Sequence, residues 1–265
     1  MDEAPDGTKY LVIHSGSRNL GKQVAELYQE MAIDQHKGIN SYVEEREAII
    51  AGFKAQGRTA EIQSALAALM NKKECEEPDM PEDLCYLTGR LFEDYLHDVE
   101  ICQKFAKRNR EIMAEIILRK TGMTGMEPFH TIHNFIETRE MILRKGAIAA
   151  HKGEKVLIPI NMRDGSILAV GKGNPEWNYS APHGAGRVMS RKQAIRSLSM
   201  EDYRKAMEGI YTTSVNEGTL DEAPMAYKSM GEILDAVKES VEIIDILKPK
   251  YNFKASEDEN PFWKR

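Results

Sequence analysis

Residues 155–171 read K-V-L-I-P-I-N-M-R-D-G-S-I-L-A-V-G, two apolar runs separated by a polar turn. The runs at 156–160 and 167–170 are rich in isoleucine and valine, which favour strands. Asp164-Gly165 between them is a dipeptide typical of tight hairpin turns. The stretch therefore predicts a β-hairpin within a strand-rich segment from about 127 to 180.

The chain before this segment has a mainly helical pattern. Apolar residues recur at helical spacing in three stretches, 24–33, 42–70 and 91–116, all within residues 21–121. A continuous apolar run at 10–13 precedes them and is typical of a buried strand. We therefore expect a short strand followed by a long helical region.

The chain after this segment mixes both patterns. From His183 onward the sequence predicts a helix beginning near Ser190, a strand at 210–215 and a helix at 230–247. Because helices and strands do not alternate in regular βαβ units, the predicted fold class is α+β.

Composition sets broad limits on function. The 265 residues are 42% hydrophobic and 29% charged, an ordinary globular composition, and no run approaches the roughly 18 apolar residues that a membrane span needs. Cys75, Cys85 and Cys102 form no CxxC pair, which argues against a disulfide framework and for a reducing, cytoplasmic location. We expect them to be small buried or partly buried residues. The net charge of −6 gives no overall attraction to nucleic acid, so an RNA partner would need a local basic patch.

Three of the seven histidines, His14, His133 and His183, adjoin polar or glycine residues at the ends of predicted elements. His14 opens H-S-G-S-R, which is either a phosphate-contacting loop or an ordinary polar turn. His183 opens H-G-A-G-R-V-M-S-R, where glycines permit close approach of a ligand and the imidazole is a competent nucleophile. His130 and His133 would share a face only on a helix, so their spacing predicts no dependable chelate.

Six motifs occur in order along the chain: H-S-G-S-R-N-L-G (14–21), H-N-F (133–135), R-K-G-A (144–147), S-A-P-H-G-A-G-R-V-M-S-R (180–191), D-E-A-P-M-A-Y-K (221–228) and L-K-P-x-Y-N-F-K (247–254). Together they resemble the RtcB-type RNA-splicing ligases. The resemblance implies an RtcB-like α+β fold of mixed sheets and helices. Residues 1–265 would form one partial catalytic domain with a helical insertion at 23–120.

Ligases of this type join an RNA end carrying a 3′-phosphate or 2′,3′-cyclic phosphate to a 5′-hydroxyl end, in tRNA splicing or RNA repair, using GTP and Mn²⁺. The resemblance implies that His183 is the catalytic nucleophile that takes up GMP, and that His14 and His133 are manganese ligands. It also implies two further groups of residues. Expected beside the nucleotide are Asn161, Ser166, Ala185, Gly186, Tyr227 and Lys254. Expected on RNA phosphates or the leaving pyrophosphate are Arg18, Lys145 and Arg187.

The sequence also departs from the family pattern. Residues 159–166 read P-I-N-M-R-D-G-S where the family has P-G-S-M-G-T-x-S, so Asn161 would have to replace a serine contact. The family's D-G-x-x-C and G-N-H motifs, which supply further metal ligands and an asparagine to GMP, do not occur. A catalytic transition-metal site generally takes at least three protein ligands, and this chain offers two. We therefore expect a fragment, a second polypeptide or oligomer partner that completes the site, or a degenerate copy.

Two alternatives stay open beside an RNA ligase. One is a non-catalytic remnant that binds RNA or a nucleotide through the H-G-A-G-R segment. The other is a metal-dependent phosphoesterase that uses His14, His133 and the arginines without guanylylation. Retention of both His183 and Lys254 disfavours the phosphoesterase, because a hydrolase needs neither a nucleophilic histidine nor a guanine pocket. If strands of a shared core are missing, exposed apolar edges and oligomerisation are expected.

Overall fold

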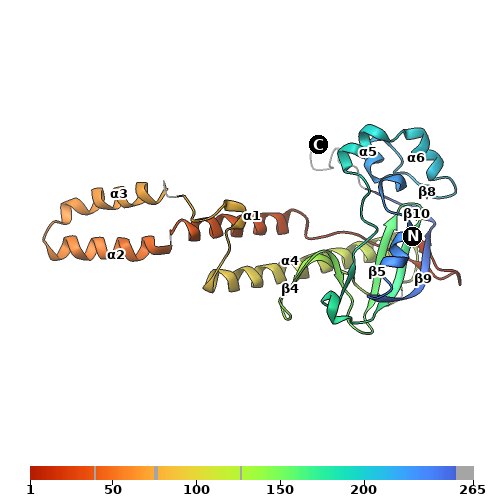
Figure 1. The fold of residues 1–265 in the computed structure, drawn as a ribbon, viewed down its shortest axis with the longest axis horizontal. Coiled ribbons are helices and arrows are strands. Elements are labelled where there is room, and N and C mark those ends of the chain that lie inside the picture. Colours follow the sequence, from red (N-terminus) through yellow and green to blue (C-terminus); the bar gives the residue numbers. More distant parts are fainter. Residues whose placement is uncertain (39, 75–76, 126, 255–265) are drawn as a thin grey trace. The chain divides into compact units, whose positions relative to one another are not determined.

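The computed structural model describes residues 1–38, 40–74, 77–125 and 127–254, which divide into two compact units. The helical unit is Ser15–Glu111; the sheet unit is Met1–His14 together with the chain from Ile112 onward. Helices and strands are both abundant but do not alternate regularly (Figure 1), so the predicted α+β class is confirmed.

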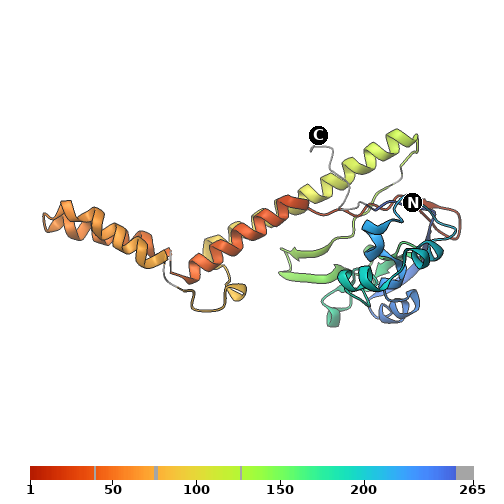
Figure 2. The same ribbon diagram turned by 90° about the horizontal axis from the view of Figure 1, so that it is seen from above.

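Among its described residues, the helical unit contains four α-helices. They are α1 (Arg18–His36), α2 (Asn40–Ala55), α3 (Ile62–Glu74) and α4 (Gly89–Thr121), whose last turns belong to the sheet unit, with 3₁₀ turns η1 (Thr59–Glu61) and η2 (Glu82–Leu84) between them. Tyr28 of α1 lies against α4: its ring centroid is 5.1 Å from that of Tyr95, and its hydroxyl donates to Asp98 at 2.8 Å. Figure 2 shows α1 beside α4, and α2 beside α3.

The predicted helical stretches are confirmed with one correction. The stretch at 42–70 is two helices rather than one, because the chain turns back at Gly57 and η1 between α2 and α3. In the part of the chain that the structure describes, no helix is both long and apolar enough to cross a bilayer.

The described residues of the sheet unit form strands in three sheets. These strands are β1 (Asp2–Glu3), β2 (Lys9–Tyr10), β3 (His133–Glu137), β4 (Ile142–Ala149), β5 (Lys155–Asn161), β6 (Gly165–Gly171), β7 (Ser180–Pro182), β8 (Tyr211–Thr212), β9 (Val241–Pro249) and β10 (Tyr251–Asn252). The largest sheet has the order β2-β1-β9-β6-β5, a second has the order β3-β4-β7, and β8 pairs in parallel with β10. Short helices complete the unit: α5 (Arg191–Ser197), α6 (Met200–Ala206), α7 (Met230–Ala236), η3 (Pro175–Trp177), η4 (Glu217–Glu222) and η5 (Pro224–Ala226).

The main apolar core lies between the two larger sheets and α7. Ile158 of β5, Ile167 of β6, Ile148 of β4 and Ile233 of α7 are all buried in it. On β6 the alternate residue Leu168 belongs to a second cluster with Leu247. Both faces of β6 are therefore covered, which explains its continuous apolar sequence.

The hairpin predicted at 155–171 is confirmed. β5 and β6 pair antiparallel with Ile158 opposite Ile167, and Gly165 ends the turn with a φ of +88°. A Cβ atom at Gly165 would lie 1.9 Å from the carbonyl oxygen of Leu247 on β9. The turn therefore needs glycine both for its backbone conformation and for the close approach of β9.

Replacing Gly165 with alanine should destabilise the sheet unit more than replacing Gly153, the matched control. Gly153 also has a positive φ (+82°), but nothing lies within 4 Å of a Cβ atom there. Both variants carry backbone strain, and only Gly165→Ala adds overpacking, so its unfolding free energy should fall by about 1–3 kcal/mol more. Urea unfolding measures this difference; equal losses in the two variants would contradict the packing argument.

Three predicted elements outside the hairpin need correction. The helix predicted at 230–247 ends at Ala236, and Val241–Pro249 is strand β9, because its β-branched residues pair with β6. The strand predicted at 210–215 is limited to Tyr211–Thr212. The strand predicted at 10–13 is limited to Lys9–Tyr10, and residues 11–13 are only partly buried. The helix predicted near Ser190 is confirmed, since the Ser190 side chain caps α5.

Two of the cysteines have the predicted environment. Cys85 and Cys102 are buried free thiols, and burial is the main cause that raises the pKa of each. Cys75 lies outside the described residues. The two described thiols are thus packing residues rather than reactive ones.

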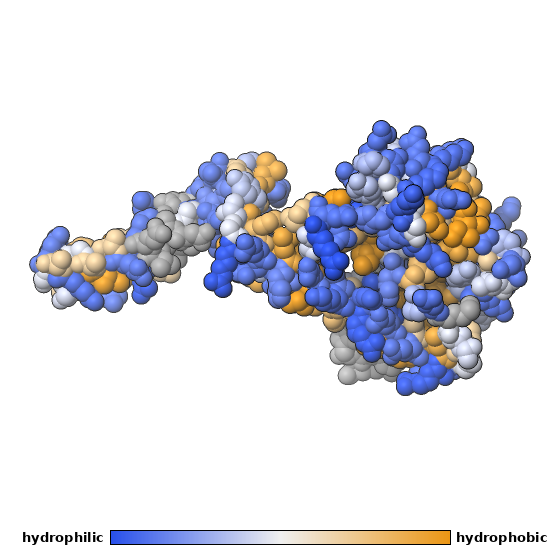
Figure 3. All heavy atoms as spheres, turned by 90° about the horizontal axis from the view of Figure 1, so that it is seen from below, coloured by the Kyte–Doolittle hydropathy of each residue, from blue (hydrophilic) through white to orange (hydrophobic). Residues whose placement is uncertain are grey.

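Apolar side chains are also exposed on both units. In Figure 3 apolar residues reach the surface along the helical unit and over the sheet unit. In the sheet unit they include Leu143 on β4 and Ile243 and Ile244 on β9. This agrees with the exposed apolar surface expected from the sequence, whereas oligomerisation stays a prediction.

Candidate functional site

Three histidines far apart in the sequence converge in the sheet unit. His14 follows β2, His133 begins β3 and His183 follows β7. The Nε2 atoms of His14 and His133 are 3.1 Å apart. The ring of His133 lies nearly parallel to that of His183, with centroids 4.9 Å apart and planes inclined by 27°. The structure thus brings together the predicted nucleophile and both predicted metal ligands.

A backbone carbonyl fixes the orientation of His183. Its Nδ1 atom lies 2.7 Å from the carbonyl oxygen of Gly146, which can only accept a hydrogen bond. Nδ1 therefore carries the hydrogen in the neutral ring, and Nε2 keeps its lone pair. Gly146 is itself held on β4 by Asn134, whose side-chain oxygen accepts from the Gly146 amide at 2.7 Å. His183 is only partly buried, so its Nε2 can serve as a nucleophile.

The spacing of His14 and His133 fits two nitrogen ligands of one metal ion. Two ligands about 2.1 Å from an ion and at right angles to each other lie about 3 Å apart, close to the observed 3.1 Å. Within the described ranges, no set of three or more His, Cys, Asp or Glu side chains could hold an ion. The two histidines therefore fit part of a coordination shell.

A second group of predicted residues surrounds the carboxylate of Glu222. The Tyr227 hydroxyl donates to Glu222 Oε2 at 2.7 Å, and the Lys254 amine lies 3.6 Å from the same oxygen. Arg187 Nη1 lies 3.6 Å from Glu222 Oε1, and Arg191 Nη1 lies 3.1 Å from it. We call these five residues the Glu222 cluster. Three of them, Arg187, Tyr227 and Lys254, were predicted from the sequence to contact ligands.

Charge and burial shift the ionisation of this cluster. Burial alone would raise the pKa of Glu222, but the Tyr227 hydrogen bond and the charges of Lys254, Arg191 and Arg187 outweigh it, so its pKa is lowered. Burial and then the neighbouring Glu222 carboxylate raise the pKa of Tyr227. At neutral pH the cluster therefore holds an ionised carboxylate and a neutral phenol.

Short backbone contacts position the H-G-A-G-R segment. The Ala185 amide donates to the carbonyl of Pro159 on β5 at 3.2 Å. Arg187 forms an isolated antiparallel bridge with Tyr227, and its guanidinium lies 4.9 Å from the centre of that ring. Arg187 also donates to the Tyr227 hydroxyl at 3.0 Å and to the carbonyl oxygen of Asp221. The segment after the nucleophile is thus fixed to β5 and to the Glu222 cluster.

The other predicted nucleotide-site residues have varied surroundings. Ala185, two residues after His183, is buried, and Gly186, three residues after it, is exposed. Ser166 is buried, and its hydroxyl donates to the Asp2 carboxylate at 3.4 Å. The Asn161 amide donates to Asp164 at 2.9 Å and its side-chain oxygen accepts from backbone amides of the β5–β6 turn. The present contacts of Ser166 and Asn161 are therefore structural, and their nucleotide role stays a prediction.

The two remaining predicted phosphate-binding residues lie in different units. Lys145 is exposed on β4 in the sheet unit, next to Gly146. Arg18 begins α1 in the helical unit. The sequence predicted no site role for Glu222, Arg191 or Asn134, although Glu222 stands inside the quoted D-E-A-P-M-A-Y-K motif and Arg191 ends the quoted H-G-A-G-R-V-M-S-R block. The motifs did not show that the Glu222 carboxylate lies close to Arg187, Arg191 and Lys254. Only the fold brings these side chains together.

Fold and site together define an α+β protein with a cluster of three histidines and an arginine-rich carboxylate cluster in its sheet unit. The family model described as tRNA-splicing ligase RtcB matches residues 4–255. The chain therefore belongs to the RtcB family.

Comparison with curated relatives also supports membership in the RtcB family. The chain is 28% identical to the RNA-splicing ligase RtcB of Escherichia coli strain K12, over 90% of this chain and 54% of that protein. It is 30% identical to the tRNA-splicing ligase RtcB of Nanoarchaeum equitans, over 86% of this chain and 48% of that protein. The chain thus spans about half the length of the curated relatives it matches.

Proposed function

We propose that this chain carries the GMP-accepting histidine of an RNA ligase. The enzyme would join an RNA 3′-phosphate or 2′,3′-cyclic phosphate end to a 5′-hydroxyl end, using GTP and Mn²⁺. The observation that carries the proposal is the Gly146 carbonyl on His183 Nδ1, which leaves Nε2 as the lone-pair nitrogen. Membership in the RtcB family and the names of the relatives as RNA-splicing ligases support the substrate class.

The chemistry follows from that lone pair. His183 Nε2 attacks the α-phosphorus of GTP, forming an N–P bond while the bond to the bridging oxygen breaks and pyrophosphate leaves with its electrons. A 2′,3′-cyclic end is first opened by water, which breaks the bond to the 2′-oxygen and leaves a 3′-phosphate. The GMP group then passes to an oxygen of the RNA 3′-phosphate, which restores the imidazole. The 5′-hydroxyl of the second end attacks that activated phosphate, forming the phosphodiester and releasing GMP. Bound by His14 and His133, Mn²⁺ would neutralise phosphate charge during transfer.

Other residues of the chain would hold the substrates. Tyr227 and Lys254 are proposed beside the guanine, with Asn161, Ser166, Ala185 and Gly186 around the nucleotide. RNA phosphates or the leaving pyrophosphate would be bound by Arg187, Lys145 and Arg18, because guanidinium and ammonium groups bind phosphate oxygens. Further metal ligands would come from another segment or a partner chain. A cytoplasmic location goes with this proposal, and the free thiols of Cys85 and Cys102 support it.

The test is covalent labelling with GTP carrying a label on the α-phosphate, in the presence of Mn²⁺. A phosphoramidate is labile in acid and stable in alkali, so the bound label should show both properties. GTP labelled on the γ-phosphate should leave no label, because that phosphate leaves with pyrophosphate. The experiment is repeated with a separately supplied polypeptide that carries the D-G-x-x-C and G-N-H motifs. No label in either arm would contradict the proposal.

A second candidate is a non-catalytic protein that binds a nucleotide or RNA. The observation in its favour is that, among the described residues, no third metal-ligating side chain accompanies His14 and His133. Saturable GTP binding without covalent label in both arms would establish this candidate instead.

A further inference from the structure

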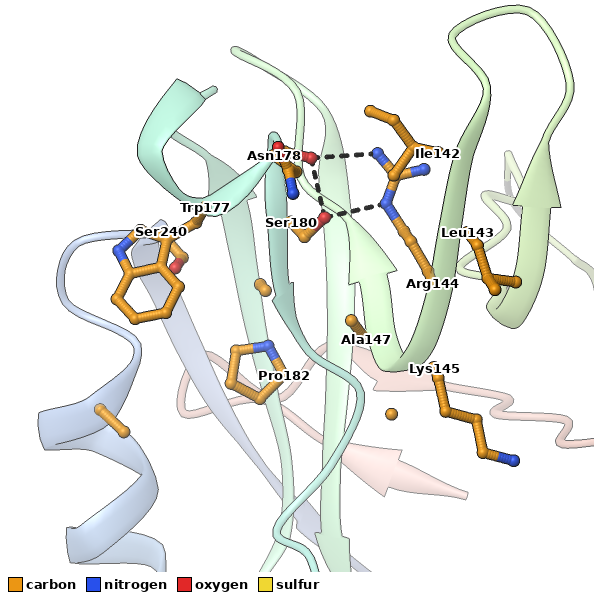
Figure 4. A pocket seen from close by; sticks show the side chains of 13 residues that line it. Ile142, Leu143, Arg144, Lys145, Ala147, Trp177, Asn178, Ser180, Pro182 and Ser240 are labelled. Atoms are coloured by element: carbon orange, nitrogen blue, oxygen red, sulfur yellow. Dashed lines mark hydrogen bonds between the residues drawn. The ribbon is translucent and has the colours of Figure 1, made fainter. Parts of the chain in front are cut away.

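A groove of about 360 Å³ lies on the sheet unit next to His183. It is lined by residues of β4 and β7, by η3 and by residues close to α7. Its volume falls in the range of small-molecule binding sites. In Figure 4 the guanidinium of Arg144 is directed to Asn178 and Ser180, whereas the Lys145 side chain extends away from it.

The groove shares part of its wall with the proposed nucleophile. Gly146, which lines the groove, is the residue whose carbonyl accepts from His183 Nδ1. Pro182, which also lines it, directly precedes His183. A ligand in the groove would therefore lie beside the segment that holds the imidazole in place.

Trp177 gives the groove a fixed aromatic surface. Its side chain is 55% exposed, although indole is costly to leave in water. Its indole nitrogen donates to Glu239 Oε2 at 3.1 Å, and η3, which ends at Trp177, is capped by the side chain of Asn174. Exposed aromatic rings held in this way are the surfaces on which proteins stack unpaired nucleobases.

Two cations of β4 lie at the same groove. Lys145 is exposed, whereas Arg144 is only 2% exposed. Arg144 donates through Nε to the Ser180 hydroxyl at 2.9 Å and through Nη2 to the carbonyl of Asn178 at 3.3 Å. Its Nη2 also lies 4.0 Å from a carboxylate oxygen of Glu140. Among the described residues, its buried Nη1 has no hydrogen-bond partner. Because this guanidinium is buried, Arg144 contributes positive charge to the wall of the groove rather than a direct contact with a ligand.

We propose that this groove binds the terminal nucleoside of the phosphate-bearing RNA end, with its base against Trp177 and its phosphate towards Lys145 and Arg144. The inference rests on the proposed function for the identity of the ligand. The guanine of GTP is the competing occupant. It is disfavoured because Tyr227, Lys254, Ala185 and Gly186, the residues expected beside GMP, do not line this groove.

The test uses the intrinsic fluorescence of Trp177. The chain has two tryptophans, and Trp263 lies outside the described residues, so a Trp263→Phe background leaves Trp177 as the single reporter. A short single-stranded oligoribonucleotide with a 3′-phosphate should quench its emission, and GTP should not. The same oligonucleotide with a 3′-hydroxyl should bind several-fold more weakly, because it offers Lys145 and Arg144 no terminal phosphate.

Matched variants locate the interaction, with binding measured by the anisotropy of dye-labelled oligonucleotide. Trp177→Ala should weaken binding about tenfold, as expected for the loss of one base–aromatic stack, and Trp177→Phe should restore most of it. Lys145→Ala should weaken binding and lower its salt dependence. Tyr211→Ala and Lys248→Ala, which remove an exposed ring and an exposed cation outside the groove, should bind as the parent does.

The outcomes separate this inference from the proposed function. Quenching by GTP but not by RNA, equal binding of both RNA ends, or undiminished RNA binding by Trp177→Ala would each overturn it. Label on His183 together with any of these results would leave the ligase proposal intact. RNA binding at Trp177 without label on His183 would leave the groove assignment intact and remove the ligase proposal.

Discussion

Replacing His183 with alanine should abolish covalent attachment of GMP completely. The variant removes the Nε2 lone pair that would form the N–P bond, and no partial substitute is expected from a neighbouring side chain. His133 stacks on His183 but is proposed to bind metal, and a nitrogen lone pair engaged by a metal ion cannot attack phosphorus. The measurement is α-labelled GTP incorporation under the conditions in which the parent chain, alone or with the supplied segment, accepts label.

Two other histidines serve as controls for this result. His151 is also partly buried, stacks on Tyr179 and lies 3.5 Å from a carboxylate oxygen of Glu140, so His151→Ala should leave labelling unchanged. His133→Ala should reduce labelling, and higher Mn²⁺ should restore part of it if the residue acts through the metal. Full labelling of His183→Ala, with loss in His133→Ala that added Mn²⁺ does not restore, would assign the nucleophile to His133 instead.

The fold was predictable wherever local sequence determines structure. The β5–β6 hairpin is specified by β-branched runs and an Asp-Gly turn within a few residues of one another. The start of α7 is also local, since Ser229 and Glu232 form a capping box there. The position at which α7 ends is not determined by local sequence. Val237, Val241 and Ile244 continue a helical spacing, yet Val241 and its successors pair with β6, more than 65 residues earlier in the sequence. That pairing decides the structure, and sequence periodicity carries no information about it.

The sequence proposed candidate site residues but could not predict how they are arranged. Motif order identified His14, His133 and His183, and the fold brings them together. Nothing in the motifs indicated that Gly146, in another motif, orients His183. The direction of the Ser166 side chain was not predictable either. Its position in the sequence predicted a nucleotide contact, whereas in the fold its hydroxyl donates to Asp2. Side-chain direction depends on the long-range pairing of strands, which a motif does not record.

Replacing Glu222 with alanine should destabilise the sheet unit by about 2–3 kcal/mol, somewhat less than the loss for a fully buried ion pair. The Glu222 side chain is 16% exposed and that of Arg187 is 22% exposed, so this part of the cluster is largely shielded from water. The side chains of Arg191 and Lys254 are 67% and 41% exposed. Because water screens their charges, their ion pairs with Glu222 should contribute little to the stability lost in the variant. The alanine would leave the Tyr227 hydroxyl and the Arg187 guanidinium without their carboxylate. Urea unfolding measures the loss, with the exposed Glu208→Ala as the matched control expected to change little.

The contribution of the Glu222 cluster to the unfolding free energy should also depend on pH in the acid range. Because the folded-state pKa of Glu222 is lowered, its ionised form stabilises the fold fully above the ordinary carboxyl pKa of 4.5. That contribution is lost as the pH falls below 4.5 and through the lowered folded-state value. Glu222→Gln keeps an oxygen that can accept from Tyr227 but has no charge, so the stability difference between the parent and this variant should be constant above pH 4.5 and shrink below it. A difference that persists undiminished in acid would assign the role of Glu222 to hydrogen bonding alone. The guanidinium group of Arg191 would then be balanced chiefly by Asp221, whose carboxylate lies 2.5 Å from it.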